Sequence, residues 1–387
     1  MSEIHSDFDT LPHRRGTGSI KWERYPDYIP YWVADMDFVS PACVLEAMHR
    51  RVDHGVFGYA HAHAGLVEAV LQYLKEMHQS SATEKDLVHL PGLVPALSLA
   101  CRAYAKPGDQ VMISSPVYYP FFHVAADAGA ELIDVPHIRD EVTWRFDWDA
   151  MEAAVTPRTR VLILCNPQNP LGRVFSEAEI TQLADFCERH DLLLVSDEIH
   201  CDLILDPEQQ HFSTLRLPEK YHERLITLMA PSKTYNVAGL GYSFAVIQND
   251  EVRRRFLKAK GCTLPEINLL AMVAAEAAYR DGEPWRRELI AYLRKNRDTL
   301  ADFIRREVPA LTIHEHAATY LYWIDCSKLN VPNPCQFFAK EAGVFLTDGG
   351  PFGGAQHVRF NFGCPRSHML AGLHEMRNAV ARTLEIS

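Results

Sequence analysis

The amino-acid sequence predicts an α/β protein that has a large domain with a mostly parallel sheet and crossover helices, and a smaller α+β domain. Three observations predict this. Short apolar runs recur along the middle of the chain, segments with helical periodicity lie between many of them, and the pattern changes after residue 283 to a long helix with short strands. Uninterrupted apolar runs are typical of strands that are buried on both faces, as in α/β sheets.

The large domain is expected over residues 46–283. Its predicted strands are QVMIS (110–114), VLILC (161–165), LLLVS (192–196), LITLM (225–229) and SFAVI (243–247). A predicted helix, 176–190, lies between two of them: Ser176 can cap its first turn and Glu179 completes a capping box. Helices between strands favour a parallel sheet with crossover connections.

The smaller domain is expected over residues 284–387. It should contain a long amphipathic helix through Glu307, two short strands and a last helix from about His368; the strands are TYLYWID (319–325) and HVRFNF (357–362). Residues 1–45, rich in proline and aromatic residues, are expected to form an N-terminal arm and part of the smaller domain. Ser40 is the expected N-cap of the next helix, with Pro41 in its first turn.

Composition excludes several kinds of partner. The chain has 387 residues, 47% of them hydrophobic, which suffices for a large core. Its net charge of −11 argues against nucleic acid. No apolar run reaches the length of a membrane span and the N-terminus lacks a signal-peptide core, so a cytoplasmic protein is expected.

Neither cysteines nor histidines indicate a metal. The nine cysteines form no CxxC pair, which favours buried free thiols over disulfides or a zinc site. The HxH pairs at 61–63 and 314–316 supply no third ligand. No metal is therefore expected.

Polar residues follow successive predicted strands at the ends where α/β sheets bind ligands. Asn169 lies in NPQNPLG, Asp197 and His200 lie in DEIHCD, and Ser232 and Lys233 lie in APSKTYNVAGL. Taken singly, Asn169 is more often a turn residue, Asp197 a helix cap and Lys233 a solvated loop lysine. Together, an amine for an aldehyde, a carboxylate for a protonated ring nitrogen and an amide for a phenolic oxygen match the requirements of pyridoxal phosphate.

These three segments resemble fold-type I pyridoxal-phosphate enzymes, the aspartate aminotransferase superfamily, and the order of the motifs matches over nearly the whole chain. The resemblance implies the pyridoxal-phosphate-dependent transferase fold. It also implies that Lys233 holds the cofactor as a Schiff base, that Asp197 pairs with the pyridine nitrogen and that Asn169 contacts the ring 3-oxygen.

The resemblance extends to the phosphate and the ring. The phosphate should lie on PGLVPAL, where Gly92 ends a strand and Leu93 opens a helix whose N–H groups face the anion, with the Ser232 hydroxyl as a further donor. Tyr118 is the expected stacking partner of the ring. The alternative is that Tyr118 is a core aromatic, because Tyr119 is an adjacent competitor.

Further residues concern the substrate and a second subunit. Arg359 matches the family arginine that binds the substrate α-carboxylate; the alternative is an internal ion pair. Tyr59 resembles the tyrosine that reaches the neighbouring subunit's phosphate, which implies a homodimer with shared active sites. Ala34 and Asp35 match the segment that lines the substrate entrance, and Asp35 could orient the substrate amine or cap the turn.

At two positions the sequence departs from the usual aminotransferase pattern, and these departures indicate which branch of the superfamily it resembles. Aminotransferases of this superfamily usually have a tyrosine at the position of His200 and an arginine at the position of Gly241. Both departures resemble the cystathionine beta-lyase branch of C-S lyases, as do GTGSIKW (16–22), YWVADMDF (31–38), HGVFGY (54–59) and EAAYRDGEPW (276–285).

The resemblance therefore implies an α,β-elimination of L-cystathionine or a related cysteine S-conjugate to a thiol, pyruvate and ammonia. In this reaction the Lys233 amine takes the Cα proton and a thiolate leaves Cβ. Two alternatives are an aminotransferase of class I/II and a catalytically quiet regulatory or binding module on the same fold. The joint presence of Lys233, Asp197 and Asn169 argues against the second alternative.

Overall fold

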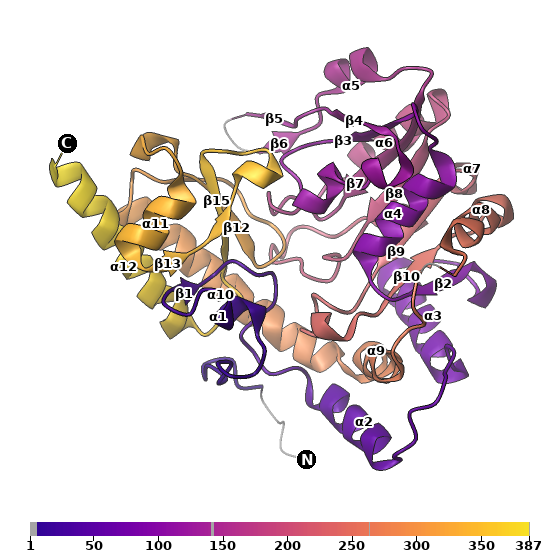
Figure 1. The fold of residues 1–387 in the computed structure, drawn as a ribbon, viewed down its shortest axis with the longest axis horizontal. Coiled ribbons are helices and arrows are strands. Elements are labelled where there is room, and N and C mark those ends of the chain that lie inside the picture. The colour runs from indigo at the N-terminus through magenta and orange to yellow at the C-terminus, as the bar shows by residue number, and fades with distance from the viewer. Residues whose placement is uncertain (1–5, 141–142, 263, 387) are drawn as a thin grey trace.

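The computed structural model describes residues 6–140, 143–262 and 264–386, and it is organised around two sheets (Figure 1). A seven-stranded sheet occupies one side of the molecule and a four-stranded sheet the other. None of the helices in the described ranges is long and apolar enough to cross a membrane.

The large sheet is mixed but mostly parallel, as predicted. Across the sheet its strands are β2 (Leu87–Leu90), β10 (Ser243–Val246), β9 (Leu225–Met229), β8 (Leu193–Asp197), β7 (Thr159–Cys165), β3 (Gln110–Ile113) and β4 (Glu131–Asp134). β10 runs antiparallel to both of its neighbours, whereas the other neighbouring pairs are parallel. The central strands β8 and β9 are buried at every position, because both faces of the sheet are covered.

Helices surround this sheet (Figure 1). They are α2 (Ala42–Asp53), α3 (Ala64–His78), α4 (Leu93–Tyr104), α5 (Trp148–Ala154), α6 (Glu177–Arg189), α7 (Glu219–His222), α8 (Asp250–Lys260) and α9 (Leu269–Asp281). The capping box predicted for α6 is confirmed: Ser176 Oγ accepts from the Glu179 N–H at 3.3 Å, and the Glu179 carboxylate accepts from the Ser176 N–H at 2.8 Å.

The predicted N-cap at Ser40 is wrong. Helix α2 begins at Ala42 with Pro41 at the N-cap position and no side-chain cap. The Ser40 hydroxyl instead donates to the Asn236 backbone carbonyl at 3.0 Å. A contact between residues so distant in sequence competes with local capping, which is why the local pattern misplaced the start of the helix.

The smaller sheet is antiparallel. Its strands, in order, are β11 (Thr312–Ile313), β12 (Leu321–Asp325), β15 (His357–Asn361) and β14 (Thr347–Asp348). Helices α10 (Glu283–Glu307), α11 (Pro334–Ala342) and α12 (Arg366–Ile386) lie with it (Figure 1). The long helix begins and ends as predicted. The domain limits at residues 45 and 283 stay a prediction.

Short elements complete the chain. In the N-terminal segment, α1 (Ile20–Glu23) precedes β1 (Ile29–Pro30), which pairs in parallel with β13 (Val344–Phe345). A hairpin joins β5 (Ile138–Arg139) to β6 (Trp144–Arg145). The 3-10 helices are η1 (Glu84–Asp86), η2 (Tyr119–Phe122), η3 (Ala126–Ala128), η4 (Thr214–Arg216), η5 (Ala238–Leu240), η6 (Ser327–Leu329) and η7 (Gly350–Phe352).

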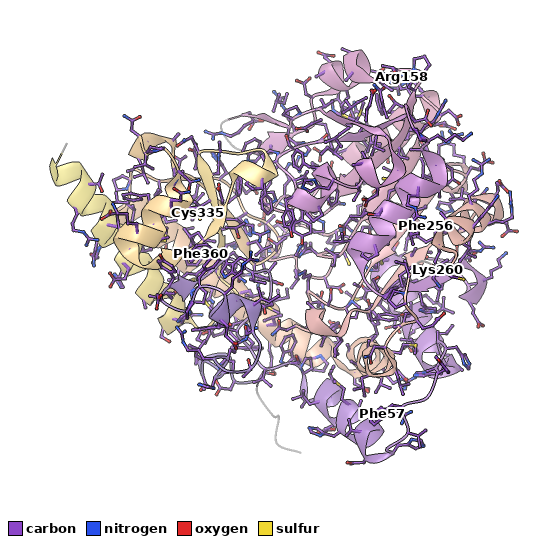
Figure 2. All side chains as sticks on the ribbon, viewed as in Figure 1. Phe57, Arg158, Phe256, Lys260, Cys335 and Phe360 are labelled. Carbon is purple, nitrogen blue, oxygen red and sulfur yellow. The ribbon has the colours of Figure 1, made fainter. Side chains whose placement is uncertain are left out.

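Apolar side chains form separate clusters that pack against the two sheets. Phe256 belongs to the cluster between the large sheet, α4 and α8, and Phe360 belongs to the cluster of the smaller sheet (Figure 2). The second cluster also takes in Phe8, Tyr31 and Phe38. The N-terminal segment is therefore bound to the smaller sheet by buried apolar surface.

Candidate active site

The residues predicted at successive strand ends lie at one edge of the large sheet. In the β7–β8 ladder Cys165 is opposite Asp197, and in the β8–β9 ladder Asp197 is opposite Leu228. The segments that carry Asn169 and Lys233 therefore leave the sheet beside Asp197. This is the carboxyl edge, where open α/β sheets bind ligands.

Asp197 is a buried carboxyl group with little compensation. Among the described residues, only the Ile199 N–H is hydrogen-bonded to its carboxylate, at 3.1 Å. Burial raises the pKa of Asp197 to about 7, against a weaker opposing effect of that bond. A carboxylate in this position is stabilised by a cation, and within the described chain the charge of Lys233 is the one that lowers its pKa.

Lys233 follows β9 and points its amine at the N-terminal segment. Its Nζ donates to the Ala34 backbone carbonyl at 2.8 Å. Burial, followed by the charge of Arg359, lowers the pKa of Lys233 to about 8. An amine that loses its proton this readily is nucleophilic near neutral pH, which is the property a Schiff-base lysine needs.

Arg359 lies on β15 of the smaller sheet and is hydrogen-bonded to Asn169, which follows β7 of the large sheet. One guanidinium nitrogen donates to Asn169 Oδ1 at 3.0 Å, another donates to the Trp32 carbonyl at 3.1 Å, and Nε has no partner among the residues that the structure describes. Burial lowers the pKa of Arg359 to about 10. Within the described ranges no carboxylate lies within ion-pair distance of this side chain, so its charge is available for an anionic ligand.

Tyr118 and His200 lie within the same electrostatic environment. Burial raises the pKa of Tyr118 to about 12, and the charges of Arg359 and Asp197 act on the phenol. The adjacent Tyr119 is 45% exposed, in an edge contact with Tyr118 at a centroid distance of 5.0 Å. His200 is buried, and its Nδ1 has no hydrogen-bond partner in the described part of the chain. Burial, together with the charges of Lys233 and Arg359, lowers the pKa of His200 well below its usual range.

The predicted phosphate segment adjoins this edge. Gly92 has a φ of 135°, and helix α4 starts directly after it with no side-chain cap. The N-cap residue therefore leaves the first N–H groups of the helix open to another acceptor. Leu93 and Ser232 are buried. A Cβ at Gly241 would lie 3.6 Å from the Pro91 carbonyl oxygen, which places position 241 beside this segment.

Tyr59 is the one predicted site residue that this chain does not bring to the others. Tyr59 is fully exposed in the segment between α2 and α3. The same segment carries Phe57, which is labelled in Figure 2 and is 59% exposed. The remaining predicted residues are joined by hydrogen bonds, by electrostatic influence or by adjacency at the strand ends.

Sequence reasoning missed three residues that hold the site together. The Tyr320 hydroxyl donates to the Ala34 carbonyl at 3.0 Å. Asn361 donates to the carbonyls of Val33 and Asp35, and Asn236 binds the backbone of Met36. One signal was available: Asn361 lies two residues after Arg359, on the same face of a strand.

Comparisons place the chain among known proteins. It matches the family "Aminotransferase class I and II" over residues 33–375. It is 34% identical to cystathionine beta-lyase PatB of Bacillus subtilis, over 97% of this chain and all of that protein. The structure of OvoB is 39% identical (TM-score 0.94, 97% and 99% covered), and that of cystalysin from Treponema denticola, which contains pyridoxal 5'-phosphate, is 30% identical (TM-score 0.94, 98% and 100% covered).

Proposed function

Because the chain belongs to the aminotransferase class I and II family, we propose that it is a pyridoxal-phosphate-dependent carbon–sulfur β-lyase. It converts L-cystathionine or a related cysteine S-conjugate to a thiol, pyruvate and ammonia. The observation that carries the proposal is the full-length likeness to a cystathionine beta-lyase. His200 and Gly241, which replace the usual aminotransferase residues, support the same branch.

The residues at the sheet edge fit the cofactor. Asp197 is a buried carboxyl group that needs a cation, and a protonated pyridine nitrogen supplies one. Lys233 offers an amine with a lowered pKa for the aldehyde. The uncapped start of α4 after Gly92 suits a phosphate, with Ser232 as a further donor, and Tyr118 suits the ring face.

The bound cofactor would supply an electron sink for the carbanion at Cα. Arg359 would bind the substrate α-carboxylate with its two terminal nitrogens, one of which Asn169 already orients. The freed Lys233 amine would take the Cα proton as general base. The electron pair left at Cα would form a Cα–Cβ double bond as the Cβ–S bond breaks with its own pair on sulfur, and the released 2-aminoacrylate would be hydrolysed to pyruvate and ammonia.

We further propose a cytoplasmic homodimer with shared active sites. The exposed Tyr59 supports a second copy, because a side chain that has no place in its own site is free to reach another. The nine free cysteines, seven of them buried, suit a reducing compartment.

The experiment mixes purified holoenzyme with L-cystathionine in the absence of any 2-oxo acid and follows pyruvate and free thiol together. Equal release of both is expected from the wild type and from Lys258→Ala, a control at an exposed lysine of α8, but not from Lys233→Ala. If amino acids convert the cofactor to its pyridoxamine form and no thiol appears, the function is that of an aminotransferase. If neither occurs with L-cystathionine, L-cysteine or S-methyl-L-cysteine, the result favours a binding module over both enzymes.

A further inference from the structure

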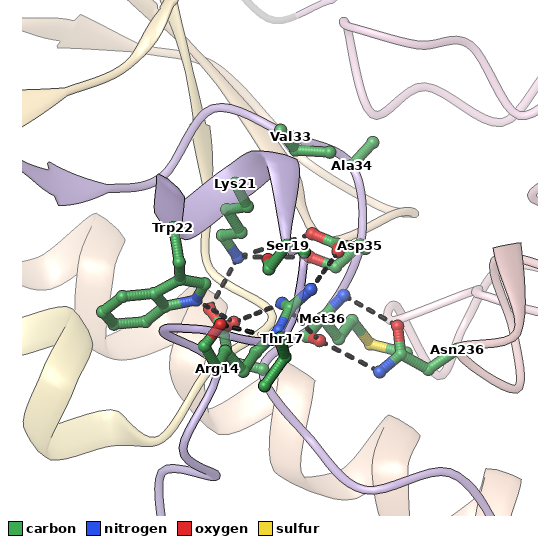
Figure 3. A network of polar contacts seen from close by, with 12 residues as sticks. Arg14, Thr17, Ser19, Lys21, Trp22, Val33, Ala34, Asp35, Met36 and Asn236 are labelled. Carbon is green, nitrogen blue, oxygen red and sulfur yellow. Dashed lines mark hydrogen bonds and ion pairs between the residues drawn. The ribbon is translucent and has the colours of Figure 1, made fainter. Parts of the chain in front are cut away.

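Residues of the N-terminal segment form a network of ion pairs and hydrogen bonds with the segment 32–37 (Figure 3). Arg14 binds the Asp35 carboxylate at 2.5 Å and the Asp37 carboxylate at 2.6 Å. Lys21 binds Asp37 at 2.6 Å and donates to the Asp35 backbone carbonyl at 3.2 Å, and the Trp22 indole donates to Asp37 at 2.8 Å. We call these five residues the arm clamp.

A tight turn holds the two cations of the arm clamp in place. The Glu23 carboxylate accepts from the N–H groups of Thr17, Gly18 and Ser19, at 2.8–3.1 Å. Gly18 has a φ of 78°, a conformation that favours glycine. This turn separates Arg14 from Lys21 in sequence and brings both side chains to the same pair of carboxylates.

The segment 32–37 also contacts the proposed catalytic lysine directly. The Ala34 carbonyl accepts from Lys233 Nζ at 2.8 Å and from the Tyr320 hydroxyl at 3.0 Å. Asn236, three residues after Lys233, binds the Met36 N–H and carbonyl, both at 2.9 Å. The cations of the arm clamp and the segment 233–236 therefore both bind residues 34–37.

The charges of the arm clamp are balanced. Two cations, Arg14 and Lys21, face two carboxylates, and Lys21 and Asp37 are fully buried. Buried ion pairs add little net stability compared with apolar packing, but they allow few alternative arrangements. Such a network suits a segment whose position matters more than its contribution to folding.

We propose that Arg14 and Lys21 are positioning residues: through Asp35 and Asp37 they fix the Ala34 carbonyl, which holds the Lys233 amine in reach of the substrate Cα. This rests on the proposed role of Lys233 in proton transfer. Without the arm clamp, the cofactor would still bind, because Asp197, Ser232 and the start of α4 are untouched, but the free amine would lose its orientation.

The test compares Arg14→Met, Arg14→Lys and Arg15→Met. Arg15 is the control: this exposed neighbour lies over the Trp22 ring at 5.5 Å and donates to the Pro26 carbonyl, but it contacts neither carboxylate of the arm clamp. Two rates are measured: backbone hydrogen–deuterium exchange of residues 31–38 without cofactor, and exchange of the Cα hydrogen of L-alanine into heavy water by the holoenzyme. L-Alanine has no leaving group, so the second rate reports proton transfer without lyase activity.

Arg14→Met is expected to speed backbone exchange in residues 31–38 and to slow Cα exchange on the order of tenfold or more, with cofactor content unchanged. Arg14→Lys should restore part of the Cα rate, because an ammonium can bind one of the two carboxylates. The proposal is overturned if Arg14→Met matches Arg15→Met in either rate, or if it loses cofactor and Cα exchange in proportion. A wild type that exchanges L-alanine but releases no thiol from cystathionine would refute the lyase and leave the positioning role intact.

Discussion

A buried carboxyl group, Asp197, and a partly buried amine, Lys233, define the chemistry at the scale of single residues. Burial raises the pKa of Asp197 to about 7 and lowers the pKa of Lys233 to about 8. In the absence of a ligand, desolvation therefore disfavours the charged form of both groups. A cationic ring nitrogen and an aldehyde would relieve both costs at once. The proposed cofactor therefore supplies the partners that these two side chains lack.

Asp197→Asn should change how the stability of the cofactor-free protein depends on pH. A carboxyl group whose pKa is raised on folding binds its proton more tightly in the folded state, so its stabilising effect is present below the unfolded pKa of 3.8 and is lost as pH rises through about 7. From pH 5 to pH 7 the free energy of unfolding of the wild type should fall by about 2 kcal/mol relative to Asp197→Asn.

Urea unfolding of both proteins at each pH and at one protein concentration checks this. Groups that are common to the two proteins cancel in the difference. A difference that does not vary with pH would mean that Asp197 is ionised in the folded chain at pH 5.

Arg359→Lys should weaken substrate use without removing the positive charge. The lysine cannot form two parallel bonds to a carboxylate, and one lost charge-assisted bond costs roughly 1.5–3 kcal/mol. The kcat/KM for L-cystathionine should therefore fall about 10- to 100-fold. Arg366→Lys, at a position bonded to Asn296, is the control, and equal effects of the two substitutions would argue against carboxylate binding by Arg359.

At the scale of elements, the sequence pattern located the buried strands β8 and β9 to within one residue but misplaced the start of a helix. The run LITLM coincides with β9, and LLLVS differs from β8 by one residue at each end, because full burial demands uninterrupted apolar residues. The local signal failed at Ser40, whose hydroxyl bonds to a distant carbonyl. Short-range patterns find elements but not the contacts that compete for their termini.

Gly172, in the loop that carries Asn169, should tolerate no side chain. Its φ is 67°, and a methyl group there would overlap the imidazole of the buried His316. Gly172→Ala should lower the free energy of unfolding by about 2 kcal/mol more than Gly108→Ala, because overpacking typically costs 1–3 kcal/mol.

Gly108 is matched in backbone conformation, with a φ of 88°, but a Cβ there would meet no atom within 4 Å. Both substitutions therefore carry the strain of positive φ, and their difference isolates the overlap with His316. Urea unfolding of the two variants measures it; equal losses would show that the loop can shift away from the imidazole.

For the whole molecule, the sequence predicted the fold class, the cofactor and the residues at the large-sheet edge. Asn169 and Lys233 follow β7 and β9, and Asp197 ends β8 between them. Neighbouring parallel strands bring their carboxyl ends together. The arm clamp was not predicted, because Arg14 meets Asp35 through a turn with no hydrophobic period. The contact of Tyr320 with Ala34 joins segments 286 residues apart, and no local rule relates them.

Shared active sites predict complementation between two defective subunits. Lys233→Ala and Tyr59→Ala should each be impaired, for lack of the amine and of the partner's phosphate contact. After unfolding and refolding as an equimolar mixture, half of the dimers would be hybrids with one intact site, so about a quarter of the wild-type lyase activity is expected. Activity equal to the average of the two separate variants would contradict sharing.

The most direct measurement concerns the fate of L-cystathionine on the enzyme over many turnovers. Holoenzyme is mixed with a large excess of the substrate without a 2-oxo acid, and the pyruvate formed per molecule of cofactor converted to the pyridoxamine form is counted. A β-lyase with Lys233 as base predicts many pyruvate molecules and a matching amount of thiol for each cofactor lost. Stoichiometric conversion of the cofactor to the pyridoxamine form, with no thiol released, would contradict the β-lyase.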